Sequence, residues 1–147
     1  MNYLHITKRS DFPDWLTVND LAMFLNETMK PYNDTVPDVE RALQYALSEE
    51  HGKGGFIILA SEEDELKGAV VILNTGMSGY IPEHILLFIA VRPGLRGRGI
   101  GGKLMDMVKE NCPGSIKLHV EHDNPARRLY ERHGFSSKYL EMRFSQK

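Results

Sequence analysis

The sequence predicts a mixed α+β fold in which helices pack against one central sheet. Two apolar runs, residues 56–60 and 66–73, are separated only by a short acidic turn, which indicates an antiparallel hairpin. A third apolar run, residues 85–91, leads through a glycine-rich loop into an amphipathic segment, as a strand followed by a helix does. Hairpins early in the chain and strand–helix–strand order later favour a mixed, mostly antiparallel sheet with flanking helices.

Length and composition fit a single domain. The 147 residues suffice to bury a core without disulfides or metals, and 41% hydrophobic and 26% charged residues are ordinary for a globular protein. The one cysteine, Cys112, cannot form an internal disulfide, which fits a reducing cytoplasm and a structural role rather than that of a nucleophile. No signal peptide or membrane span is recognisable. We therefore expect one cytoplasmic domain over residues 1–147.

The first half of the chain is expected to contribute an edge strand and two helices. Weak alternation of Tyr3, His5 and Ile6, in a short segment that ends near Lys8, predicts the strand. A first helix is predicted over residues 11–29, and a second begins near Pro37, because proline is favoured in the first turn. The apolar faces comprise Val18, Leu21, Ala22, Leu25 and Met29 in the first helix, and Val39, Ala42, Leu43, Ala46 and Leu47 in the second.

The second half of the chain is expected to complete the sheet. Residues 74–83 contain two glycines and a proline and predict an exposed loop. Residues 116–120 alternate between apolar and polar side chains, which predicts a strand with unlike faces. A helix is predicted to start at Asn124-Pro125 and to end at Gly134, and residues 139–144 predict a last strand.

Residues 96–102, between the third apolar run and its helix, read Arg-Gly-Arg-Gly-Ile-Gly-Gly. The first turn of a helix has unpaired N–H groups and a partial positive charge. Glycines let the backbone approach an anion closely, and the two arginines add charge. The pattern therefore favours a phosphate or pyrophosphate site, with a merely flexible loop as the alternative.

The spacing of this loop differs from the phosphate-binding patterns Gly-x-x-x-x-Gly-Lys-Ser/Thr and Gly-x-Gly-x-x-Gly. Arg96-x-x-Gly99-x-Gly101, after a strand that ends in Ala-Val, instead resembles the acyl-CoA loop of the GNAT superfamily of N-acyltransferases. A second block, residues 124–135 (NPARRLYERHGF), resembles that family's Asn…Ala-x-x-Leu-Tyr-Glu-x-x-Gly-Phe helix. Two motifs in the right order are far more specific than either alone, and by this resemblance the chain is identified as a member of the superfamily.

The resemblance implies a GNAT-type fold whose fourth and fifth strands splay apart so that acyl-pantetheine inserts between them. It also implies acetyl-CoA as the cosubstrate and no metal. Backbone N–H groups of residues 89–91 are expected to stabilise an oxyanion where the strand bulges. The family commonly has asparagine seven residues before the tyrosine that matches Tyr130. That position is Asp123 here, so whether Asp123 or Asn124 contacts the pantetheine stays open. The implied cosubstrate-binding residues are Ile89, Ala90, Val91, Arg96, Gly97, Arg98, Gly99, Ile100, Gly101, Gly102, Asn124 and Tyr130.

Acyl transfer from a thioester to an amine needs a route for the amine proton, donors for the oxyanion and a proton for the departing thiolate. Tyr130 matches the family's tyrosine beside the thioester sulfur and is expected to be the acid, although periodicity alone favours a core tyrosine. For the base, His119 matches the position of a glutamate in some members, and histidine titrates near neutral pH. Glu83 matches another position used by members. His84, Glu121 or a water-mediated route are the alternatives.

Charge is unevenly distributed in a chain of net charge −2. Residues 11–91 carry fourteen acidic against four basic residues, and residues 92–147 carry six against twelve. In the family, the first two helices and their connection form much of the wall opposite the phosphates. The nine acids between residues 11 and 50 therefore predict a cationic acceptor, with solvated helix faces as the alternative.

Two functions of different classes follow from these observations. The first is an acetyl-CoA-dependent N-acetyltransferase that acts on a primary amine, such as a polyamine, a lysine, a protein N-terminus or another small amine. The second is a non-catalytic acyl-CoA-binding module with an intact loop. No nucleic-acid or membrane partner is expected, and a homodimer is compatible with the sequence.

Overall fold

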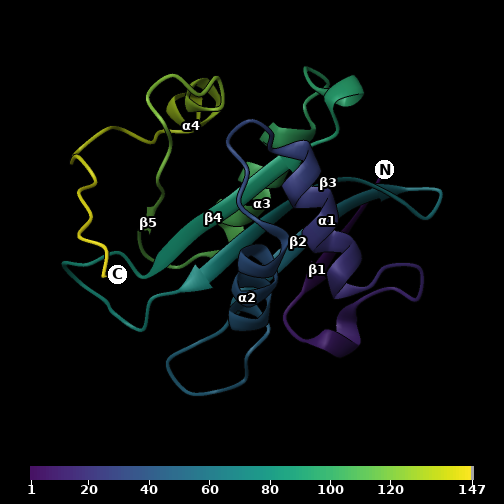
Figure 1. Cartoon of the computed structure of the whole chain (residues 1–147), viewed down its shortest axis with the longest axis horizontal. Coiled ribbons are helices and arrows are strands. Elements are labelled where there is room, and N and C mark those ends of the chain that lie inside the picture. The colour runs from purple at the N-terminus through teal and green to yellow at the C-terminus, as the bar shows by residue number, and fades with distance from the viewer. Residues whose placement is uncertain (147) are drawn as a thin grey trace.

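A five-stranded sheet runs through the molecule, with its strands side by side in chain order (Figure 1). The computed structural model describes residues 1–146. The first four strands pair antiparallel, and the fifth pairs parallel to the fourth. The predicted mixed, mostly antiparallel sheet is thereby confirmed. The strands are β1 (Asn2–Ile6), β2 (Gly55–Glu62), β3 (Glu65–Asn74), β4 (His84–Val91) and β5 (Ile116–Lys117).

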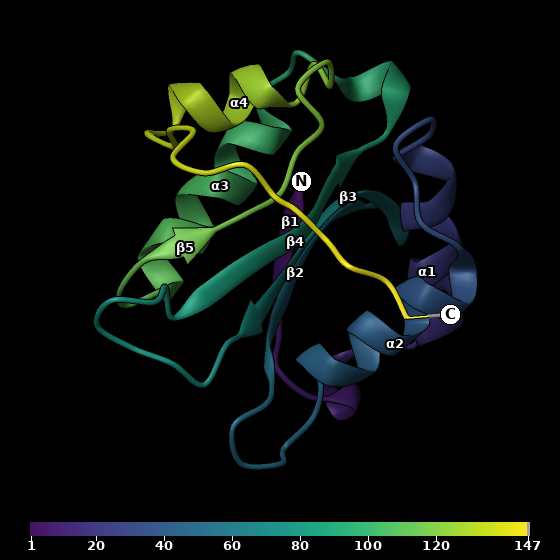
Figure 2. The ribbon, with the colours of Figure 1, turned by 60° about the vertical axis from the view of Figure 1, so that its left-hand side comes forward.

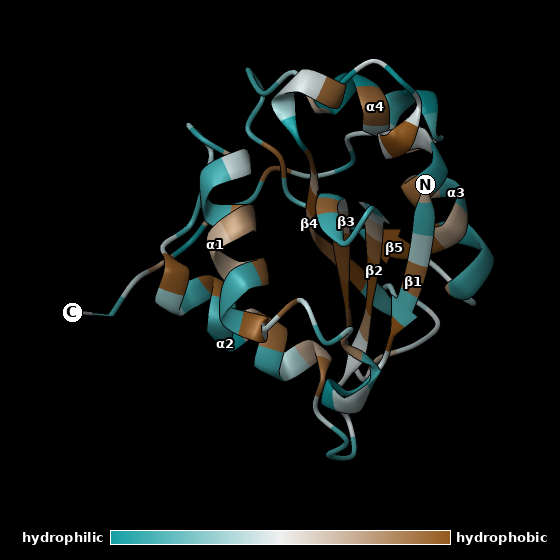
Figure 3. Cartoon of the chain, turned by 90° about the vertical axis from the view of Figure 1, so that its right-hand side faces the viewer, coloured by the Kyte–Doolittle hydropathy of each residue, from teal (hydrophilic) through white to brown (hydrophobic). Residues whose placement is uncertain are grey.

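Helices cover both faces of this sheet (Figure 2). On one side lie α1 (Val18–Thr28) and α2 (Val36–Ala46), and on the other lie α3 (Ile100–Asn111) and α4 (Arg127–Arg132). Two short 3₁₀ turns, η1 (Arg9–Asp11) and η2 (Pro93–Leu95), complete the regular structure of the described residues. The hydrophobic residues concentrate in the strands between these two helical layers, so the core is divided into two halves by the sheet (Figure 3).

The central hairpin explains why the strands read as continuous apolar runs. Residues 57–60 of β2 are fully buried, because helices cover both faces of the sheet. Glu63 and Asp64 connect β2 to β3 with φ of 53° and 56°, the left-handed pair that a type I′ turn requires. The antiparallel hairpin predicted from the two runs is confirmed.

The first helix begins later than predicted. Instead of running from residue 11, α1 starts at Val18, after Thr17 accepts a hydrogen bond from the Asp20 N–H (3.0 Å) and Asp20 accepts one from the Thr17 N–H (2.9 Å). This reciprocal cap sets the helix start. Asp11 belongs to a separate turn, where its carboxylate accepts hydrogen bonds from the Thr7 N–H and hydroxyl groups. These hydrogen bonds hold the pKa of Asp11 below the usual range. The second helix begins as predicted, with Thr35 as its cap and Pro37 in its first turn.

The end of the chain differs most from the sequence-based expectation. The alternating segment 116–120 forms a strand only at Ile116–Lys117, and residues 135–146 form no strand. Alternation favours a strand only where a neighbouring strand supplies hydrogen bonds, and no partner pairs with these residues in the described chain. The predicted last strand is therefore wrong. Its apolar side chains are 76–89% exposed: Tyr139, Leu140, Met142 and Phe144.

The divergence of β5 from β4 opens one edge of the central strand. β5 pairs with β4 only at His84 and Ile85, so that edge of β4 has no strand partner from Leu86 to Val91. This is the splayed arrangement that the family resemblance implied. Within residues 1–146, no helix has the length and apolar character needed to cross a bilayer.

Candidate functional site

A cavity of about 560 Å³ lies where the β4–α3 loop, the start of α4 and the α1–α2 connection meet. All of the residues predicted to bind the cosubstrate line it except Arg98. The wall opposite them consists of residues 28–32, at the end of α1 and in its connection to α2, which is where the family resemblance placed it. Segments from both helical layers thus converge at the open edge of β4.

The glycine-rich loop leaves room for an anion at the start of α3. Gly97 and Gly99 both have φ of 83°, and a Cβ added at either would meet no atom within 4 Å. Gly99 is the N-cap of α3 and provides no side-chain cap, and the first helical bond is donated by the Lys103 N–H to the Gly99 carbonyl (2.9 Å). The N–H groups of residues 100–102 therefore lack helical partners and carry the positive end of the helix dipole. This arrangement fits a phosphate group.

A glycine in β3 lets α3 approach the sheet closely, whereas a Cβ at Gly101 would make only an ordinary van der Waals contact, 3.4 Å from Leu129 of α4. In β3, a Cβ at Gly68 would lie 3.0 Å from the Ala90 carbonyl oxygen and 3.3 Å from Ile100. Gly68 thus allows the start of α3 to sit directly against the sheet. Gly68 was not among the residues predicted from the sequence, although a glycine inside a strand is a signal for such an approach.

Arg96 has a structural task at the cavity wall. Its Nε donates to the Val91 carbonyl (3.1 Å), and its terminal nitrogen donates to the Thr28 carbonyl (2.9 Å). The guanidinium group therefore ties the loop to the end of α1. Across the cavity mouth, the Tyr32 hydroxyl donates to the Asp123 carbonyl (3.3 Å). Both contacts join segments far apart in the sequence.

Tyr130 is buried, 7% exposed, and lines the inner wall of the same cavity. Burial, followed by the nearby Glu121 carboxylate, raises the pKa of Tyr130 to about 12. Its hydroxyl group stays protonated at neutral pH and can donate a proton. The Tyr130 ring also packs edge-on against Phe135 at 6.1 Å, so the residue has a core contact as well.

Asn124 lines the cavity, whereas Asp123 does not. The Asn124 side chain accepts a hydrogen bond from the Ala126 N–H (2.9 Å) and donates one to Glu121 (3.3 Å). Asp123 contributes its backbone carbonyl to the contact with Tyr32. Of the two residues left open by the sequence, the geometry favours Asn124 as the side chain available to a ligand.

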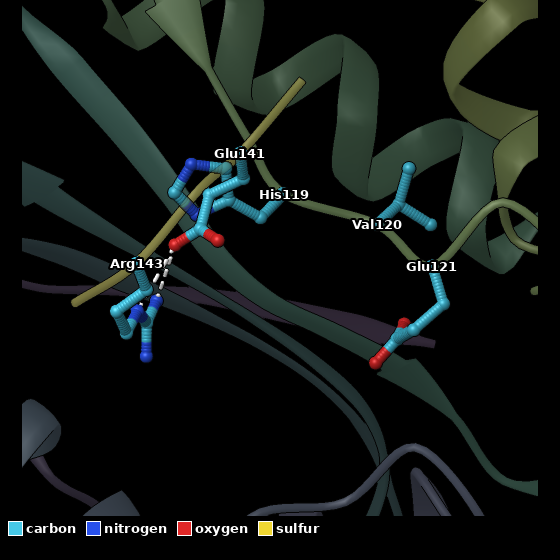
Figure 4. A pocket seen from close by; sticks show the side chains of 5 residues that line it. All are labelled: His119, Val120, Glu121, Glu141 and Arg143. Atoms are coloured by element: carbon cyan, nitrogen blue, oxygen red, sulfur yellow. Dashed lines mark hydrogen bonds and ion pairs between the residues drawn. The ribbon is translucent and has the colours of Figure 1, made fainter. Parts of the chain in front are cut away.

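His119 faces a separate, smaller cavity of about 230 Å³ (Figure 4). This cavity is lined by residues 119–121 together with Glu141 and Arg143 from the C-terminal segment. Glu141 accepts two hydrogen bonds from Arg143 (2.7 and 3.0 Å), and Figure 4 shows the pair close to His119. The structure therefore does not bring His119 into the cavity that contains Tyr130.

Glu83 and His84 lie at the opposite end of β4 from the glycine-rich loop. The Glu83 carboxylate accepts hydrogen bonds from the N–H groups of Ser115 (2.8 Å) and Gly79 (3.1 Å), which hold its pKa below the usual range. His84 Nε2 lies 3.0 Å from the Pro113 carbonyl and donates a hydrogen bond to it in the tautomer that carries its proton on Nε2. Its Nδ1 is buried without a partner in the described chain. Neither residue lines the larger cavity.

The bulge in β4 lies earlier than the family resemblance implied. Val71 pairs with Phe88 and Ile72 with Leu86, so Leu87 is the extra residue. The expectation of a bulge at residues 89–91 is therefore wrong in position. Residues 89–91 continue the ladder with β3 and still line the cavity.

The acidic residues of the first two helices do not line the larger cavity: none of the nine between residues 11 and 50 does so. Glu121 is instead the carboxylate whose charge raises the pKa of Tyr130. In the part of the chain that the structure describes, no group of three His, Cys, Asp or Glu side chains could hold a metal ion.

Known proteins of similar sequence and structure define the class of this chain. Residues 21–135 match the Acetyltransferase (GNAT) family, and no curated protein sequence is significantly similar. A GNAT family acetyltransferase from Streptococcus pneumoniae has a TM-score of 0.70 at 18% identity, with 99% of each chain covered. A ribosomal-protein-alanine N-acetyltransferase from Brucella melitensis has a TM-score of 0.65 at 17% identity, covering 99% of this chain and 100% of that one. An aminoglycoside N-acetyltransferase in complex with CoA has a TM-score of 0.55 at 17% identity, covering 76% of this chain and 85% of that one.

At such identities the likeness to these structures is one of fold, whereas the family match spans most of the chain. The chain belongs to the GNAT acetyltransferase family. It is an enzyme of that family, an acetyltransferase, and its larger cavity lies at the end of β4, between the β4–α3 loop and the start of α4.

Proposed function

We propose that this enzyme transfers the acetyl group of acetyl-CoA to a primary amine in the 560 Å³ cavity. The observation that carries the proposal is the shared location of two unlike groups. The uncapped N-terminus of α3 suits a pyrophosphate, and Tyr130 offers a protonated hydroxyl group in the same cavity. A thioester ligand that carries phosphates at its other end would occupy both.

The reaction requires a nitrogen–carbon bond to form and a carbon–sulfur bond to break. The lone pair of the neutral amine attacks the thioester carbonyl carbon, and the electrons of the carbon–sulfur bond leave with sulfur. Tyr130 donates its proton to the sulfur and regains one from water. The open edge of β4 offers backbone donors along the acyl-pantetheine, and the amine nitrogen loses its extra proton to a base.

For the base we keep His119, Glu83 and a water-mediated route as the candidates. Glu83 is less suitable as the base than His119, because two backbone N–H groups stabilise the charged form of its carboxylate and reduce its basicity. His119 lies on the segment that carries Glu121, whose carboxylate acts on Tyr130. A water molecule between this segment and the cavity would connect them.

The acceptor is proposed to be cationic. The Glu121 carboxylate near Tyr130 and the acidic excess over residues 11–91 both attract positive charge. Two structural neighbours, an aminoglycoside N-acetyltransferase and a ribosomal-protein-alanine N-acetyltransferase, are enzymes that acetylate nitrogen. The position of the helix acids outside the cavity supports the alternative, in which they only solvate the helices.

Release of free thiol from acetyl-CoA, measured with a panel of amines, tests the proposed function. An enzyme releases thiol in proportion to the amine acetylated over many turnovers. A non-catalytic acyl-CoA-binding module would bind acetyl-CoA and release none with any amine. Mass spectrometry of the amine products separates true transfer from simple hydrolysis of the thioester.

A further inference from the structure

The three arginines of α4 differ in what they contact. Arg127 pairs with Glu131, with 3.7 Å between Nε and a carboxylate oxygen. The side chains of Arg128 and Arg132 make no hydrogen bond or ion pair with any residue among 1–146. Both line the 560 Å³ cavity. Two unpaired guanidinium groups therefore border the proposed cosubstrate site.

Their spacing on the helix places them together and away from the thioester end. Residues four apart share one face of a helix, whereas residues two apart do not. Arg128 and Arg132 thus lie on one face, and Tyr130, midway between them, lies on the other. Tyr130 is buried at the inner wall, while both arginines are exposed at the rim. A ligand whose thioester meets Tyr130 would present its remote end to the arginines.

Two like charges four residues apart destabilise a helix, particularly one as short as α4. No carboxylate of the described chain compensates either arginine. An anionic ligand would remove this repulsion. A bound anion would therefore offset the repulsion between the two arginines, which no group of the described chain offsets.

Of the other arginines near the cavity, Arg98 does not line it, and two more are committed to backbone carbonyls. Arg96 donates to the carbonyls of Val91 and Thr28, and Arg92 donates twice to the Leu66 carbonyl (2.8 and 3.0 Å). The start of α3 offers backbone N–H groups to a pyrophosphate. CoA carries a third phosphate, a monoester on the ribose 3′ oxygen, at the end remote from its sulfur. Cationic side chains near this end of the ligand would stabilise this dianion.

We propose that Arg128 and Arg132 bind the 3′-phosphate of CoA, so that the enzyme selects CoA over ligands that share its pantetheine and pyrophosphate but lack this group. Guanidinium groups suit a phosphate because they donate paired, charge-assisted hydrogen bonds. This inference rests on the proposed function. It also implies that acyl groups carried on a protein-bound phosphopantetheine arm, which has no 3′-phosphate, are poor donors.

The experiment compares the affinities of CoA and 3′-dephospho-CoA by isothermal titration calorimetry. The wild-type protein should bind CoA more tightly by roughly 10-fold, the scale of a charge-assisted hydrogen-bonded contact. In the double variant Arg128→Gln/Arg132→Gln, the affinity for CoA should fall by the same factor, and that for 3′-dephospho-CoA should change by less than about twofold. The control Arg127→Gln removes a charge from the same helix and should keep the preference.

Three results would overturn the inference. Equal affinities of the wild-type protein for both ligands would mean that the 3′-phosphate is not recognised. An equal loss of affinity for both ligands in the double variant would mean that the arginines bind the pyrophosphate, or only add to the positive potential around the site. Binding of neither ligand by the wild-type protein would overturn the proposed function as well. Circular dichroism melting checks the fold of each variant, and if the double variant unfolds, each single variant must show part of the lost preference.

Discussion

The two ends of β4 differ in which polar groups are left for a ligand. At the start of the strand, the Glu83 carboxylate accepts hydrogen bonds from two backbone N–H groups, and His84 Nε2 lies 3.0 Å from the Pro113 carbonyl. The buried His84 Nδ1 has no partner among the described residues, but His84 lines neither cavity. At the other end, the first N–H groups of α3 have no side-chain cap, and the Tyr130 hydroxyl has no hydrogen-bond partner among the described residues. Buried polar groups are normally paired within a protein. Groups already paired stabilise the fold, and groups left unpaired beside a cavity are those that a ligand completes.

The strongest test of this comparison fills the unpaired end. Gly101→Glu places a carboxylate at the start of α3, where it occupies the phosphate space and repels an anion. Acetyl-CoA should raise the Tm of the wild-type protein, because a ligand that binds only the folded state stabilises it. This shift should vanish in the variant. Differential scanning fluorimetry with and without acetyl-CoA measures it.

A matched glycine provides the control. Gly94→Glu adds the same charge in η2, where an added Cβ meets no atom within 4 Å and the residue does not line the cavity. That variant should keep the ligand-induced shift. If folded Gly101→Glu bound acetyl-CoA as tightly as the wild-type protein, the loop would not be the phosphate site.

Removal of the Tyr130 hydroxyl should have the next largest effect. Tyr130→Phe keeps the ring and its packing against Phe135, so acetyl-CoA binding should persist. Turnover should fall by roughly 10²-fold or more, the usual scale for loss of a positioned general acid. Steady-state thiol release reports the rate, and calorimetry reports the binding. An unchanged rate in pre-steady-state measurements of the chemical step would leave Tyr130 as a core residue.

The sequence predicts best where the deciding interactions are local. The hairpin of β2 and β3, the faces of α1 and α2, and the loop before α3 depend on burial and turn chemistry encoded within each segment. The start of α1 was misplaced because residues 11–17 have helical spacing of apolar side chains, yet the reciprocal Thr17–Asp20 cap fixes the boundary. Local signals compete, and the cap prevails.

Features that depend on distant partners could not be predicted in this way. Residues 118–120 and 139–144 alternate as strands do, but alternation cannot say whether a neighbouring strand is within reach. The same limit applies to the site. Glu83 was a candidate base because of its position before β4. The two hydrogen bonds that reduce its basicity come from Gly79 and from Ser115, and Ser115 is 32 residues away in the sequence, so no local pattern indicates it.

His119→Ala tests whether the segment after β5 supplies the base. If His119 accepts the amine proton, its removal should slow turnover at saturating acetyl-CoA by roughly 10-fold or more, while acetyl-CoA binding persists. Steady-state thiol release and calorimetry measure the two. His122→Ala is the control, since His122 lies on the same segment but lines neither cavity. A larger effect of Glu83→Gln than of His119→Ala would move the base to the start of β4.

The salt dependence of the acceptor's KM tests the cationic preference. Attraction between exposed charges weakens as the screening length shortens to about 8 Å near physiological ionic strength. The KM of a cationic amine should therefore rise several-fold with added salt, and that of a neutral amine should stay flat. Equal KM values for the two amines at low salt would show that neither Glu121 nor the helix acids steer the acceptor.

The smallest expected effect concerns the satisfied end of β4. The N–H groups of Ser115 and Gly79 favour the charged Glu83 carboxylate and lower its pKa in the folded protein. A depressed pKa adds stability above the unfolded-state pKa of about 4.5, and that stability is lost as the pH falls through the folded-state value. Glu83→Gln should therefore lower the Tm by a few degrees at neutral pH, with the difference shrinking below pH ~4.5 as the wild-type carboxyl group protonates. Glu110→Gln, an exposed change on α3 without ion-pair or hydrogen-bond partners in the described chain, should leave the Tm unchanged at every pH.

If Glu83 is structural, thiol release by Glu83→Gln should match that of the wild-type enzyme. A collapse of turnover with an unaltered Tm would instead show that a group paired by the backbone still takes part in the chemistry, and the distinction between the two ends of the strand would fail.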